Sequence, residues 1–219
     1  MADSTSPQLK NVDIDMDGAT TTLTFDETVD VSTLLRGAVT LLGNRSGSPA
    51  VTFSACPDGT CSLSKDGTVV KINILDDDMN QIKLKLFATE ASNAFVSITD
   101  ALVKDAAQVP NKVKQVLAKD AIKVSGYTKD GTDPRFASFK VDLEDSVITM
   151  TFTEPVKPAS INYTGIVLQA SSSSRAESLR LTGGSVAETA LASMTITINV
   201  FDSGGQRNCA DLQDTGSGN

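Results

Sequence analysis

The feature of the sequence that most constrains the fold is an internal repeat. The segment DSTSP at 3–7 reappears as DGTDP at 130–134, and TLTFDETV at 22–29 reappears as TMTFTEPV at 149–156. Both pairs have the same offset of 127 positions, and no gap is needed between them. Self-similarity at a fixed period indicates tandem copies of one structural unit. We therefore expect two related domains.

Each copy has the residue pattern of β-strands. Ile148, Met150 and Phe152 alternate with threonines, as expected for a strand that buries one face. After a one-residue slip, INILD at 72–76 matches INVFD at 198–202. Asp-Gly and Gly-Gly pairs separate such runs and predict turns. Short strands at this spacing predict an all-β protein made of two immunoglobulin-like β-sandwiches.

The two copies are expected to differ in completeness. The first sandwich is expected over residues 3–129, with a short helix near 76–86 that an Asp of the acidic run at its start would cap. A second helix is expected near 112–118. The second sandwich is expected over 130–219 and lacks the counterpart of residues 93–129. We expect it to expose an apolar groove and an unpaired strand edge, which other sequence or a neighbour's strand would fill.

Composition excludes several classes of function. The 219 residues carry a net charge of -8 and 40% hydrophobic residues, so a core is expected while a nucleic-acid partner is not. No apolar run is long enough to predict a membrane span, and the first residues do not resemble a signal peptide. We expect either a cytosolic protein or an internal piece of a longer chain, and the repeat favours the second.

The chain has three cysteines and no histidine. Cys56 and Cys61 bracket a turn-forming stretch, so a loop disulfide between them is expected. A zinc site is the alternative, but it would need carboxylates to complete its ligands. Cys209 is left for an intermolecular bond or a partner thiol. Without histidine, Ser-His-Asp and Cys-His arrangements cannot form. A carboxylate pair for glycoside hydrolysis is the remaining enzymatic alternative and would need a buried acidic dyad in a cleft, but no acidic pair stands in an apolar stretch and aromatic residues are scarce. We therefore expect no enzymatic activity and no catalytic residue.

Two further patterns indicate modification or ion binding. Asn44 and Asn162 begin N-glycosylation sequons. The run at 13–18 matches the opening of an EF-hand calcium loop, but Thr24 stands at its twelfth position, so a hairpin turn is favoured. The acidic run at 76–78 is the other candidate for calcium. No cofactor is otherwise expected.

Several segments together resemble a known family. TLTFDETVD at 22–30, TFTEPV at 151–156, LTGG at 181–184 and the closing VSGYTKDGTDP at 124–134 are similar to tandem bacterial-type Ig-like repeats. Such repeats occur in giant cell-surface proteins of cyanobacteria and aquatic protists, including the swimming-associated surface repeat. The resemblance implies an extracellular filament, flagellar hair or cell-surface array whose partners are copies of itself or neighbouring repeats. A calcium- or glycan-dependent adhesin is the alternative.

Overall fold

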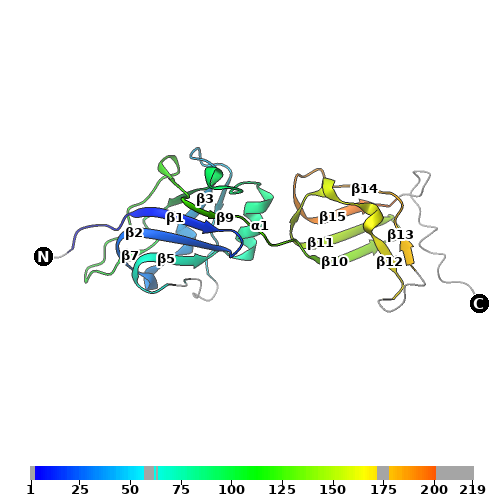
Figure 1. The fold of residues 1–219 in the computed structure, drawn as a ribbon. Coiled ribbons are helices and arrows are strands. Elements are labelled where there is room, and N and C mark those ends of the chain that lie inside the picture. The colour runs from blue at the N-terminus through cyan, green and yellow to red at the C-terminus, as the bar shows by residue number, and fades with distance from the viewer. Residues whose placement is uncertain (1–2, 57–61, 63, 172–177, 201–219) are drawn as a thin grey trace, which may run out of the picture. The chain divides into compact units, whose positions relative to one another are not determined.

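The computed structural model describes residues 3–56, 62, 64–171 and 178–200. It divides into two compact units, Met1–Thr132 and Asp133–Asn219, called unit 1 and unit 2 below. Each unit is built from two β-sheets (Figure 1), so the expected all-β sandwich fold is confirmed. Among the described residues, no helix is long and apolar enough to cross a membrane.

Unit 1 has two sheets whose facing sides share one hydrophobic core. The first has the strand order β5-β2-β1-β9, with β7 also paired to β2, and the second has the order β4-β3-β6-β8. Leu23 of the first sheet and Leu41 of the second are both fully buried in this core. The strands are β1 (Leu9–Asp15), β2 (Thr20–Asp30), β3 (Val39–Leu42), β4 (Ala50–Thr52), β5 (Gly67–Asn73), β6 (Phe95–Ile98), β7 (Lys104–Asp105), β8 (Ile122–Lys123) and β9 (Gly126–Thr128).

The strands β1 and β9 bring the two ends of unit 1 together. β1 pairs antiparallel with β2, whereas β9 pairs with it in parallel, with Ile14 opposite Tyr127. The amide of Ser125 donates to Val12 and that of Met16 donates to Thr128, both at 2.9 Å. The closing strand of unit 1 is therefore held directly against its opening strand.

The helix α1 (Asp76–Leu84) confirms the expected short helix. The predicted Asp cap is wrong, because Leu75 is the N-cap residue and it provides no side-chain cap. The three aspartates lie within the first turn instead, where their charge suits the helix dipole. Met79 and Ile82 on the inner face are buried in the core.

The helix expected near 112–118 is absent from the described structure. The amide of Val113 donates to Val103 and that of Val116 donates to Ile98, at 3.0 and 2.9 Å. Because these amides bond to other segments, the stretch runs extended. Short 3₁₀ turns occur at Val31–Thr33, Arg36–Ala38, Ala91–Asn93, Ala118–Asp120, Pro158–Ser160 and Tyr163–Gly165.

Unit 2 has one four-stranded sheet, with the order β10-β11-β15-β14, and one hairpin of β12 and β13. Its smaller core is centred on Ile148, Leu181, Ile196 and Ile198. The strands are β10 (Phe136–Asp142), β11 (Val147–Val156), β12 (Val167–Gln169), β13 (Ser178–Arg180), β14 (Ser185–Val186) and β15 (Ser193–Asn199).

Unit 2 repeats the strand register of unit 1. The pairs between β10 and β11 follow those between β1 and β2 at the offset of 127, including a bulge just after Phe136 and after Leu9. The hairpins also share a left-handed residue at the same place, Ala19 with φ of 47° and Ser146 with φ of 55°. A bulge and a strained turn are specific backbone features, so the two units are copies of one strand design.

Candidate functional site

The described residues contain one group of three carboxylates close enough to share a cation. Asp3 precedes β1, Glu27 lies on β2 and Asp105 ends β7, and one oxygen from each lies within 4.8 Å of the others. Strand pairing causes this closeness, because Val29 of β2 stands opposite Asp105. Clustered carboxylate oxygens are the ligands that calcium prefers. This acidic cluster can therefore contribute ligands to a hard divalent cation.

The three carboxylates differ in their surroundings. Asp105 is buried and accepts hydrogen bonds from the Asn111 amide at 2.9 Å, the Asn111 side chain at 2.8 Å and the Ala107 amide at 3.2 Å. Burial by itself would raise the pKa of Asp105, but these hydrogen bonds outweigh it and lower that pKa. Asp105 is thus held as a carboxylate.

Glu27 has the opposite tendency. Its Oε1 atom is buried and has no hydrogen-bond partner. Burial raises the pKa of Glu27, and repulsion from Asp3, Asp105 and Asp26 adds to the shift. The ionised cluster therefore carries an electrostatic cost that a proton or a cation at Glu27 would reduce.

The two calcium candidates named from sequence are used differently in the structure. Asp13 accepts from the Gly126 amide at 2.6 Å, Asp15 from the Gly18 amide at 2.8 Å and Asp17 from the Gly131 amide at 3.0 Å. The flanks of this run are the strands β1 and β2, as the hairpin interpretation requires. These carboxylates bind backbone amides of three different segments: the β1–β2 turn, strand β9 and the stretch after β9.

The acidic run at 76–78 is split in the same way. Asp76 and Asp77 are exposed, whereas Asp78 is buried and forms an ion pair with buried Arg36 at 3.3 Å. Asp78 also accepts from the Ser54 amide at 2.9 Å and the Ser54 hydroxyl at 2.7 Å. The run therefore contributes one structural ion pair rather than three convergent ligands.

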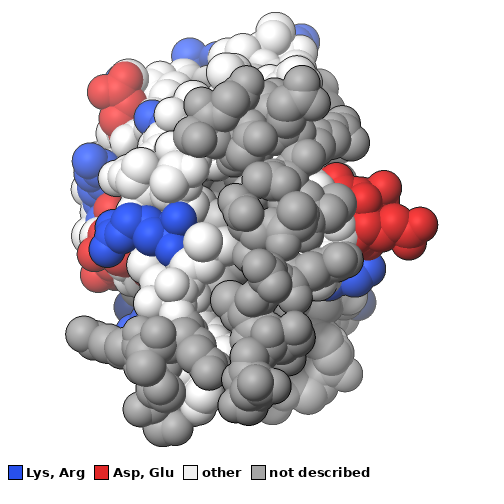
Figure 2. Space-filling view, turned by 90° about the vertical axis from the view of Figure 1, so that its right-hand side faces the viewer, with Lys and Arg blue, Asp and Glu red and all other residues white. Residues whose placement is uncertain are grey.

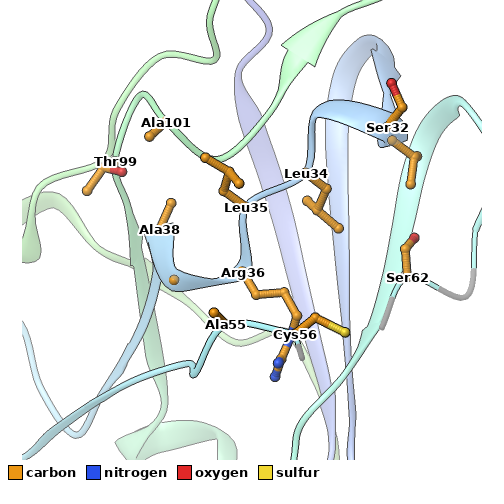
Figure 3. Close-up of a pocket in the computed structure, with 12 residues that line it drawn as sticks. Ser32, Leu34, Leu35, Arg36, Ala38, Ala55, Cys56, Ser62, Thr99 and Ala101 are labelled. Carbon is orange, nitrogen blue, oxygen red and sulfur yellow. The ribbon is translucent and has the colours of Figure 1, made fainter. Parts of the chain in front are cut away.

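A cleft of about 570 Å³ lies beside that ion pair in unit 1. Its lining is mostly small or apolar, as Figure 3 shows, and includes Leu34, Leu35, Ala55 and Thr99. The Arg36 guanidinium lies 5.8 Å from the centre of the Phe53 ring and its charge is matched by Asp78. Among the described residues, the cleft is therefore an apolar recess.

The predicted disulfide and glycosylation sites are partly placed by the structure. Cys56 is disulfide-bonded, while Cys61 and Cys209 lie outside the described residues, so the Cys56–Cys61 pairing stays a prediction. Asn44 and Asn162 are both exposed. Each accepts a hydrogen bond from the hydroxyl of its own sequon, Ser46 or Thr164. Their glycosylation stays a prediction.

Unit 2 contains an apolar hollow of about 290 Å³, called the apolar groove below. Two exposed phenylalanines of β10 form its rim, with ring centres 6.1 Å apart. The residues that define it are Phe136, Phe139, Ile148, Met150, Ile166, Val167 and Leu168. Large exposed aromatic side chains on a β-sheet indicate a surface that packs against another element.

The charged residues do not gather into one field on the face seen in Figure 2. Lysine or arginine and aspartate or glutamate side chains both appear there among the described residues.

Comparison with known proteins gives distant structural likenesses and no family. No protein-family model matches the chain, and no curated protein matches it. The solved structures that resemble it include the N-terminal part of the bacterial S-layer protein SbsC, with a TM-score of 0.36 and 14% identity over 91% of this chain and 45% of that one. A structure of domains 1–6 of SbsC gives a TM-score of 0.37 and 13% identity over 91% of this chain and 26% of that one.

The chain spans less than half the length of these S-layer structures. At TM-scores below 0.5 and identities of 13 to 14%, the likeness establishes neither a shared fold nor a shared activity. The resemblance of the sequence to surface repeats of cyanobacteria and protists accordingly stays a prediction.

Proposed function

We propose that this chain is a structural, non-enzymatic segment of an extracellular filament, flagellar hair or cell-surface array built from tandem β-sandwich repeats. The observation that carries the proposal is the repeated backbone design: bulge, left-handed turn residue and strand register recur at one offset. Tandem copies of one sandwich in a single chain suit an extended assembly in which neighbouring repeats are the partners.

The last residues of unit 1 also fit a load-bearing role. Asp130 forms an ion pair with Lys83 of α1 at 2.9 Å, and the Gly131 amide and Thr132 hydroxyl both bond to Asp17. These contacts fix the chain against unit 1 as it leaves β9.

Electron microscopy of the native material tests this proposal, with light scattering of the purified chain over a range of concentrations beside it. We expect filaments or ordered arrays in the micrographs and scattering that rises with concentration in the absence of any ligand. Isolated particles in native material, together with scattering independent of concentration, would overturn it.

A calcium- or glycan-dependent adhesin is the second candidate, and the acidic cluster of Asp3, Glu27 and Asp105 is the observation that favours it. A glycan array probed with calcium and again with a chelator tests it. Calcium-dependent binding that the Asp105→Asn variant loses would favour the adhesin, whereas binding to no glycan under either condition would exclude the glycan form.

A further inference from the structure

The apolar groove of unit 2 can be compared position by position with the same surface in unit 1. Phe136 corresponds to Leu9 and Phe139 to Val12 in the shared strand register. Leu9 and Val12 are 5% and 0% exposed, but Phe136 and Phe139 are 55% and 58% exposed. Because the backbone pairing is the same, the difference in exposure comes from what covers these positions.

In unit 1 the covering element is the segment 93–129. Its apolar residues Ala94, Val96, Ile98, Val113 and Val124 belong to the same core cluster as Leu9 and Val12. Its strand β6 pairs with β3, and its strand β9 pairs with β1. The segment therefore both fills the core and completes both sheets.

The corresponding strand edges of unit 2 are open among the described residues. β10, the counterpart of β1, is the outer strand of its sheet, and β12, the counterpart of β3, pairs with β13 alone. An outer strand presents a row of unpaired amides and carbonyls that can pair with another chain. Two open edges beside one apolar groove are the requirements for strand addition.

Charge indicates the kind of segment that fits. Segment 93–129 carries six lysines and three aspartates, whereas residues 133–219 carry ten acidic and six basic residues. The body that remains in unit 1, residues 1–92, is also acidic, with thirteen acidic and seven basic residues. In unit 1 a basic covering segment thus lies on an acidic body, and the described residues of unit 2 also carry more acidic than basic side chains, six against four.

We infer that the apolar groove of unit 2 is the docking site for an extended, lysine-bearing segment of the 93–129 type that a neighbouring repeat supplies. Its apolar residues cover Phe136, Phe139 and Met150, and its backbone adds strands to β10 and β12. This inference rests on the proposed function, because it names the contact by which successive repeats are joined.

A synthetic peptide with the sequence of residues 93–129 tests the inference by titration calorimetry against the full chain. We expect saturable binding of one peptide per chain that weakens as salt is added. Phe139→Ser in the full chain is expected to weaken binding at least tenfold. Leu191→Ser is the matched control, because Leu191 is an apolar residue of unit 2 that is 76% exposed and lies outside the groove.

A second peptide with Val96→Asp and Ile98→Asp tests the apolar face of the occupant, and we expect it not to bind. Because Phe139 is largely exposed, Phe139→Ser is expected to keep the circular dichroism spectrum of the parent chain, which separates lost docking from lost folding. Absence of binding by the parent peptide, or equal binding by the Phe139→Ser and Leu191→Ser chains, would overturn the inference.

Sedimentation of the full chain without peptide distinguishes another occupant. Dimers that Phe139→Ser abolishes would show that a second copy of this chain covers the groove through its own surface, and the inference would be wrong in its occupant. Failure here also differs from failure of the proposed function. Filaments in native material without peptide binding would support the proposed function and refute the docking site. Peptide binding without filaments would support the docking site and refute the proposed function.

Discussion

Replacing Asp78 with alanine is expected to destabilise unit 1 more than any exposed substitution on α1. The Asp78 side chain is 4% exposed and its partner Arg36 is 2% exposed. It accepts hydrogen bonds from the amide and the hydroxyl of Ser54 in addition to its ion pair. The substitution therefore leaves a buried guanidinium without its carboxylate and the partly buried Ser54 amide without its acceptor.

The size of the effect follows from these lost contacts. Removing one partner of a buried ion pair costs about 3–5 kcal/mol, because the remaining charge stays buried without compensation. Domains of this size have total stabilities of about 5–15 kcal/mol. With a urea dependence of about 2 kcal/mol per molar, the midpoint of unfolding should fall by roughly 2 M.

Tyrosine fluorescence during urea unfolding can report on unit 1 alone. The chain has two tyrosines and no tryptophan, so a Tyr163→Phe background leaves Tyr127 of β9 as the reporter. The Tyr127 hydroxyl donates to the Ala88 carbonyl at 2.8 Å, which ties the reporter to the unit 1 core. Asp77→Ala is the matched control, because Asp77 is exposed in the same helical turn.

The double variant Arg36→Met with Asp78→Leu completes the test. It removes both charges and fills the site with apolar side chains, so it should recover much of the stability that Asp78→Ala loses. A midpoint for Asp78→Ala within about 0.5 M of the Asp77→Ala midpoint would refute the reasoning. So would a double variant that is less stable than Asp78→Ala.

Three further predictions concern individual side chains. Folding raises the pKa of Glu27, so the folded chain is most stable while Glu27 is protonated, below its ordinary pKa, and loses this stability as pH rises through the raised pKa. Glu27→Gln should therefore raise the urea midpoint at pH 7 but not near pH 4. An equal gain at both pH values would contradict this prediction. Leu41 is fully buried whereas its counterpart Leu168 is half-buried. Leu41→Ala should therefore lower the free energy of unfolding by about 3 kcal/mol and Leu168→Ala by roughly 1 kcal/mol. Equal losses, measured by urea unfolding of single-tyrosine variants, would show that unit 2 packs as tightly as unit 1. Asn44 and Asn162 are exposed, so secretion from a eukaryotic host should add a glycan to each. Each of the variants Asn44→Gln and Asn162→Gln should then lose one glycan and run faster on a gel than the parent chain. Equal mobility of the parent chain and both variants would exclude glycosylation at both sites.

The sequence predicts the strands well where one face is buried, because alternation is then required. Ile148, Met150 and their threonine neighbours fall on β11 as expected, and the offset of 127 reappears as strand register. The helix expected near 112–118 is wrong because that stretch pairs with Val103 and Ile98. Long-range backbone bonds of this kind leave no local pattern in the chain.

The candidate sites were harder to predict from sequence than the strands. Asp3, Glu27 and Asp105 come together only through the pairing of β2 and β7, so no short motif contains them. Arg36 and Asp78 are likewise separated by 42 positions. The exposure of Phe139 depends on which segment covers β10, and an apolar residue in an alternating pattern looks the same whether it is covered or open.

The parallel pairing of β1 and β9 has a mechanical consequence. Because β1 opens unit 1 and β9 closes it, pulling the two ends apart slides these strands past each other along their length. The hydrogen bonds from Ser125 to Val12 and from Met16 to Thr128 are then loaded together instead of one after another. Unit 1 should resist tension along the chain far better than a hairpin whose strands peel open from one end.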